Sequence, residues 1–139
     1  MGLFDRLISN KPIHLTPQAG LLLSAITMVA IDGEVDDDEL AIIRRLDGSA
    51  NTEAWEAAVK TWKTTRSVDE RVSLATAAMN QKQRLVAIAN LIDIAMADGV
   101  LAGAEERLLE AFVDAFDIDE SIVETIVKVI AIKNDRSDF

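Results

Sequence analysis

Four carboxylates recur at matched positions in two parts of the sequence, and carboxylate oxygens are the atoms that hard cations bind. An Asp-Gly pair at Asp32 is followed seven residues later by Glu39, and a second pair at Asp98 is followed at the same distance by Glu105. Oxygen donors of this kind suit Ca²⁺, Mg²⁺ or Mn²⁺ rather than softer metals. The repeated spacing therefore predicts a divalent-cation site made of Asp32, Glu39, Asp98 and Glu105.

The two aspartates stand where the apolar pattern predicts the C-terminal end of a helix. The helix dipole is negative there, so a carboxylate costs about 0.3–1 kcal/mol unless a positive group offsets it. The amides of the following turn, a Lys or Arg side chain, or a cation could be that group. If the two halves pack about a pseudo-two-fold axis, the four carboxylates would converge on one cation.

A purely structural interpretation of the two corners also stays open. An aspartate can fold its carboxylate onto the amides of the turn, and Glu39 can complete a capping box with Asp36. At the second corner Ala102 stands in the cap position, so Glu105 cannot complete such a box. This difference favours the ligand interpretation slightly over the structural one.

Asp93 is a further carboxylate of interest because it interrupts an otherwise apolar helical segment. A carboxylate beside a hydrophobic core needs a partner. Asp93 could join the cation cluster, pair with an arginine of the central segment, or face solvent on the polar side of its helix. The solvent-facing role is favoured.

Apolar residues recur at helical spacing along the chain and predict an all-α fold without a sheet. The predicted helices cover 17–32, a segment between Asp36 and Asp47, 52–64, 68–79, 81–98, 103–116 and 120–133. Helix starts are marked by Thr16 with Pro17, Ser67 with Glu70, Asn80 with Gln83, and Asp119. The expected architecture is a single-domain bundle of about seven helices, with two duplicated helix–corner–helix units in a pseudo-two-fold arrangement. Residues 1–15 are an N-terminal segment and connector, 16–133 the helical domain, and 134–139 a flexible tail.

Composition excludes several functional classes. The chain has 139 residues, no cysteine and one histidine, which excludes disulfides, thiolate metal sites and multi-histidine centres. A formal charge of −10 argues against binding to nucleic acid. Neither a phosphate-binding loop nor a nucleophile elbow is present, so no enzymatic activity is expected. The sequence has no apolar run of about 18 residues and no secretory signal, so we expect a cytoplasmic protein without a transmembrane segment.

The central part of the chain is basic although the chain as a whole is acidic. Between Lys60 and Arg84 there are six basic and two acidic residues. This segment is either an ordinary solvated helix surface or a docking face. The second possibility gives an alternative function, a metal-free protein–protein interaction module that docks on a membrane-associated partner through this face and the N-terminal turn.

The two corner segments, residues 30–39 and 95–105, together resemble the tellurite-resistance TerB-like family, and the resemblance covers residues 17–133. It implies an all-helical, internally duplicated, cytoplasmic and non-enzymatic domain. It also implies an acidic cluster at Asp32, Glu39, Asp98 and Glu105 that binds a divalent cation. The implied role is regulatory or scaffolding, in a stress or tellurite response near the inner membrane and through a membrane partner.

Overall fold

The computed structural model describes residues 14–31, 42–43, 45–46, 52–97, 101 and 103–139, and all regular structure in them is helical. The helices are α2 (Pro17–Ala30), α4 (Thr52–Thr64), α5 (Val68–Ala78), α6 (Gln81–Ala95), α7 (Gly103–Phe116) and α8 (Glu120–Asn134). The predicted all-α class is confirmed for the described residues. The seven-helix count and the duplication stay predictions, because the predicted helix between Asp36 and Asp47 lies largely outside the described residues.

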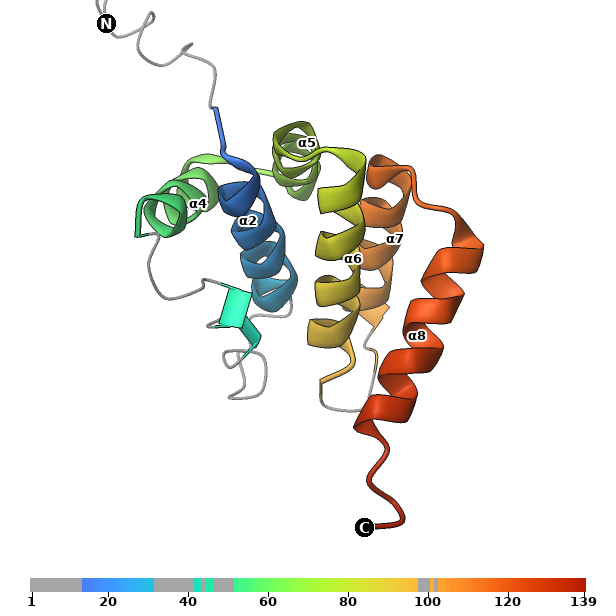
Figure 1. The fold of residues 1–139 in the computed structure, drawn as a ribbon. Coiled ribbons are helices and arrows are strands. Elements are labelled where there is room, and N and C mark those ends of the chain that lie inside the picture. The colour runs from blue at the N-terminus through green and yellow to red at the C-terminus, as the bar shows by residue number, and fades with distance from the viewer. Residues whose placement is uncertain (1–13, 32–41, 44, 47–51, 98–100, 102) are drawn as a thin grey trace, which may run out of the picture.

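The helices are arranged around two central members, α2 and α6. Helix α2 packs against α4, α5 and α6, while α6 packs in turn against α7 and α8. Helices α4 and α8 consequently lie at opposite edges of the molecule (Figure 1). The C-terminal end of α6 is therefore remote from α4 and close to α8.

Helix α2 is central because nearly all of its surface is apolar. Its buried side chains include Leu22, Leu23 and Met28, and even Ser24 and Thr27 are buried. The Ser24 and Thr27 hydroxyls donate to the carbonyl oxygens four residues earlier, at 2.8 and 2.7 Å. These bonds satisfy the two polar groups within the helix, so α2 can be surrounded on all sides.

Local side-chain caps define the helix starts. The Thr16 hydroxyl accepts a hydrogen bond from the Ala19 amide, ahead of a proline in the first turn of α2. Asn80 and Gln83 form the reciprocal capping box that the sequence predicts for α6. The Ser67 side chain accepts from the Glu70 amide at the start of α5. Asp119 occupies the N-cap position of α8, but its side chain makes no capping hydrogen bond, so that part of the prediction is wrong.

The close crossing of α2 and α5 depends on Gly20. A Cβ atom at Gly20 would lie 2.8 Å from the Ala78 Cβ and 3.3 Å from the Ala75 carbonyl oxygen. Real Cβ atoms do not approach other atoms this closely, so the missing side chain sets the distance between the two helices.

Candidate functional site

Glu105 is the one predicted cation ligand that lies among the described residues. Asp32, Glu39 and Asp98 all lie outside them, so whether the four carboxylates converge stays a prediction. Within the described residues, no three His, Cys, Asp or Glu side chains are grouped closely enough to hold a metal ion.

Glu105 occupies a position where a carboxylate is electrostatically favoured. It lies in the first turn of α7, at the positive end of the helix dipole. Only 5% of its surface is exposed, and it is the one charged residue among the buried residues that the structure describes. Glu105 is not isolated there, because it interacts with another group. The first turn of α7 thus carries a buried acidic side chain.

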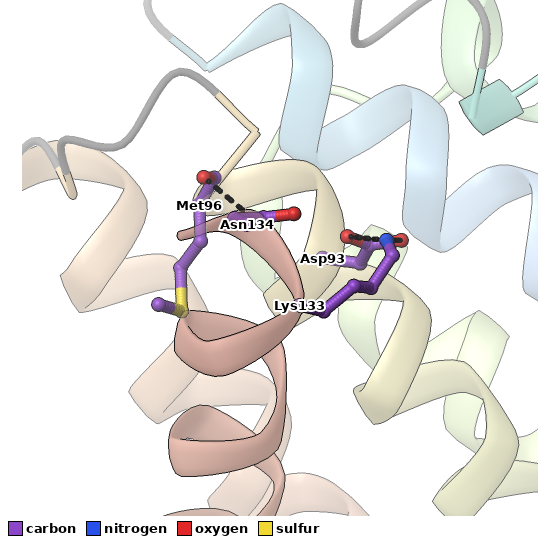
Figure 2. Close-up of polar contacts among 4 residues, drawn as sticks. All are labelled: Asp93, Met96, Lys133 and Asn134. Atoms are coloured by element: carbon purple, nitrogen blue, oxygen red, sulfur yellow. Dashed lines mark hydrogen bonds and ion pairs between the residues drawn. The ribbon is translucent and has the colours of Figure 1, made fainter. Parts of the chain in front are cut away.

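Asp93 forms an ion pair with the last helix. The Lys133 Nζ atom lies 3.1 Å from Asp93 Oδ1 and 3.3 Å from Oδ2 (Figure 2). The Asp93 side chain is 17% exposed, so the favoured solvent-facing role is replaced by a partly covered pair. Its partner is a lysine of α8. Asp93 therefore pairs with neither an arginine of the central segment nor a cluster of cation ligands among the described residues.

The adjacent residue of α8 contacts the end of the same helix. The Asn134 side-chain amide donates to the Met96 carbonyl oxygen at 3.4 Å (Figure 2). The last carbonyls of a helix lack intrahelical donors, and α6 has no basic residue of its own in its last turn. Lys133 and Asn134 supply both the positive charge and a donor. We call these two contacts the α8 clamp; it holds α6 just before the second corner.

Sequence reasoning missed the α8 clamp because its signal is not local. Lys133 stands in the last turn of α8, where a lysine is already favoured by the dipole of its own helix. Its carboxylate partner is 40 residues earlier in the chain. Only the packing of α8 on α6 brings the two side chains together.

Two of the basic residues of the central segment are bound internally. Arg71 donates to the Thr65 hydroxyl at 2.9 Å and to the carbonyl oxygens of Trp62 and Thr65 at 2.8 and 3.1 Å. Its guanidinium carbon also lies 4.8 Å from the centre of the Trp62 ring. Arg84 donates twice to the Thr76 carbonyl oxygen. These arginines connect helices, so they are not available for a docking face.

The remaining basic residues of the segment are exposed: Lys60, Lys63, Arg66 and Lys82. Lys60 and Lys63 border a shallow hollow on α4 together with Trp55, Glu56, Val59 and Thr64. Trp55 is 36% exposed, so apolar surface and positive charge lie side by side at this edge of the molecule. The predicted basic face is therefore smaller than the sequence suggests, and it is centred on α4.

The fold and the position of Glu105 define a class of protein: an acidic helical domain with a buried glutamate seven residues after an Asp-Gly pair in the sequence. The chain belongs to the family described as tellurite resistance protein TerB, whose sequence model matches residues 18–127. This match confirms the resemblance carried by the two corner segments. It covers the domain from α2 to the middle of α8.

Comparison with curated proteins gives no significant match, and comparison with solved structures gives none either. No helix among the described residues is both long and apolar enough to cross a membrane.

Proposed function

We propose that this TerB-family chain is a non-enzymatic, cytoplasmic module of a tellurite-resistance or stress-response system, and that its corner carboxylates bind a divalent cation. The cation would be Ca²⁺, Mg²⁺ or Mn²⁺, and its binding would serve a regulatory or scaffold role. The four proposed ligands are Asp32, Glu39, Asp98 and Glu105. Family membership supports the type of system, and the placement of Glu105 supports the cation site.

The observation that carries the cation proposal is the burial of Glu105 at the head of α7. Glu105 is a buried oxygen donor, and the Asp-Gly pair seven residues earlier in the sequence offers a second carboxylate. Hard cations favour such all-oxygen donor sets. A bound cation would also offset the cost of an aspartate at the C-terminal end of a helix.

Calorimetric titration with Ca²⁺, Mg²⁺ and Mn²⁺ tests this site. We expect saturable binding by the wild type, with loss of at least about tenfold in affinity in Asp32→Asn/Asp98→Asn and in Glu105→Gln. Asp69→Asn/Glu70→Gln is the matched control, because it removes two exposed carboxylates of α5 and leaves the corners intact. Equal binding by the control and the corner variants, or no binding heat at all, would refute the site.

The alternative function is a metal-free interaction module for a membrane-associated partner. It is favoured by the α4 edge, where Lys60 and Lys63 flank Trp55 and Val59 and where Arg66 is exposed nearby. Aromatic residues such as Trp55 and arginines such as Arg66 are enriched at protein interfaces.

Charge reversal separates the two functions. Under the alternative, Lys60→Glu/Lys63→Glu/Arg66→Glu abolishes capture of a partner from solubilised membranes and leaves cation binding unchanged. Asp32→Asn/Asp98→Asn should do the opposite. Lys82→Glu is a control at an exposed basic residue outside α4. If the triple reversal leaves partner capture intact, the α4 edge is not the docking face.

A further inference from the structure

An apolar groove runs between α7 and α8, at the edge of the molecule opposite α4. It encloses about 640 Å³. Its apolar lining consists of Ile92, Leu101, Leu109, Val113, Val123 and Val127. Leu101 and Val127 are 40% and 37% exposed, so part of this apolar surface faces water. The groove stays open because α8 packs chiefly on α6 rather than on α7.

Acidic side chains border this groove from both helices. They are Glu106, Glu110 and Asp114 of α7 and Glu120 and Glu124 of α8, all of them exposed. Within each helix they are spaced four residues apart, so each set forms a row along one face. The described residues that line the groove include no lysine, arginine or histidine. Like charges at this spacing repel each other, and no basic residue among the described lining offsets that repulsion.

We infer that this groove binds a cationic amphipathic helix of a partner protein. The apolar side chains of such a helix, at spacings of three, four and seven residues, would contact the apolar lining. Lys and Arg residues on its two flanks would reach the acidic rows of α7 and α8. The same rows repel the phosphates of nucleic acid and of anionic lipid, so a basic protein segment is the occupant that the charge pattern favours.

This inference is independent of the cation site and of the α4 edge. Among the described residues, the groove is lined by α6, α7, α8 and Leu101, and Glu105, the one proposed cation ligand that the structure describes, is not part of that lining. Binding can therefore be measured in the presence of EDTA, so that failure of the cation proposal does not affect the result.

The test uses the full chain and a synthetic amphipathic peptide as the probe. The peptide carries leucines on one helical face and Lys and Arg on its flanks; a scrambled peptide of identical composition destroys that face. We expect the ordered peptide to bind at least about tenfold more tightly than the scrambled one, by fluorescence anisotropy. Amide chemical-shift changes in α7 and α8 should accompany binding.

Matched charge reversals locate the binding surface. Glu110→Lys/Asp114→Lys should weaken binding of the ordered peptide by at least about tenfold. Asp69→Lys/Glu70→Lys changes the net charge by the same amount on α5 and should leave binding within about threefold of wild type. Val127→Asn alters only the apolar lining and should also weaken binding. Circular dichroism checks that each variant is folded.

Several outcomes would overturn the inference. If both charge reversals weaken peptide binding equally, or if the scrambled peptide binds as tightly as the ordered one, the binding is only non-specific attraction to an acidic protein. Concentration-dependent self-association of the wild type, lost in Glu110→Lys/Asp114→Lys, would make a second copy of this chain the occupant and would exclude the partner helix. Absence of peptide binding by the wild type would exclude it as well.

Discussion

Gly20 shows how a single missing side chain sets a helix–helix distance in this protein. Helices α2 and α5 approach so closely there that a methyl group would contact the Ala78 Cβ at 2.8 Å. At Gly103, in the first turn of α7, an added Cβ would meet no atom within 4 Å. Substitution of alanine at these two glycines therefore separates the effect of crowding, which occurs only at Gly20, from the effect of helix propensity.

We predict that Gly20→Ala lowers the free energy of unfolding by about 1–3 kcal/mol, because crowding at the α2–α5 crossing outweighs the better helix propensity of alanine. Gly103→Ala should raise it by a few tenths of a kcal/mol, up to about 1 kcal/mol. Urea denaturation followed by circular dichroism measures both. A stabilised Gly20→Ala variant would mean that the crossing has room for the methyl group.

Asp135, just beyond α8, can be used to test whether residues 135–137 form an ordered turn. The Ser137 hydroxyl and backbone amide donate to Asp135 Oδ1 at 2.7 and 2.9 Å. These hydrogen bonds, the side-chain one first, lower the pKa of Asp135 below its usual value. Since the folded-state pKa is lowered, the turn is favoured at neutral pH and is lost as the pH falls through that pKa.

An NMR titration should therefore find the pKa of Asp135 below that of a free aspartate, and Ser137→Ala should move it back upward. If Asp135 titrates like a free aspartate, residues 134–139 behave as the flexible tail that the sequence predicts.

At the scale of helices, Arg71 connects α4 to α5. Its guanidinium bonds two carbonyl oxygens near the end of α4 and stacks on Trp62. We predict that Arg71→Lys lowers the free energy of unfolding by about 1–2 kcal/mol, because an ammonium group cannot reproduce the planar, multiply bonded contact. Arg66→Lys, at an exposed arginine, should change it by less than about 0.5 kcal/mol. Equal effects in thermal or urea unfolding would contradict a connecting role for Arg71.

The α8 clamp makes a second prediction at this scale. Lys133→Ala/Asn134→Ala should increase amide hydrogen exchange at Met96 and Ala97, whose amides bond to the carbonyls of Ile92 and Ile94. The total loss of stability should be small, about 0.5–2 kcal/mol, because the ion pair is partly exposed. Lys128→Ala, at an exposed lysine of the same helix, is the control. Unchanged exchange at the end of α6 would show that the clamp is not needed to hold it.

Helix bounds could be predicted closely from the sequence because caps are local. Thr16, Ser67 and Asn80 each bond an amide three residues later, so a short segment contains the whole signal. The contacts between helices could not be predicted this way. Gly20 against Ala78, and Lys133 against Asp93, join residues that are far apart in the chain. Of the candidate cation site, only the helical position and burial of Glu105 are described, and its burial depends on the packing of α7.

At the scale of the whole molecule, the formal charge of −10 means that folding brings many like charges together. Raising NaCl from about 10 mM to about 100 mM shortens the Debye length from about 30 Å to about 10 Å. We predict that this change raises the melting temperature by about 2–4 °C. Asp69→Asn/Glu70→Gln, with two fewer charges, should show a smaller rise. A fall with salt would mean that ion pairs such as Asp93–Lys133 outweigh the general repulsion.

The 40-residue separation between Asp93 and Lys133 affects the order of events during synthesis. Residues 17–95 can emerge from the ribosome and begin to fold while Lys133 and Asn134 have not yet been translated. The C-terminal end of α6 then lacks its clamp until Lys133 and Asn134 have also been added to the chain. A nascent chain that stalls before residue 133 would consequently leave the acidic end of α6 without its lysine partner.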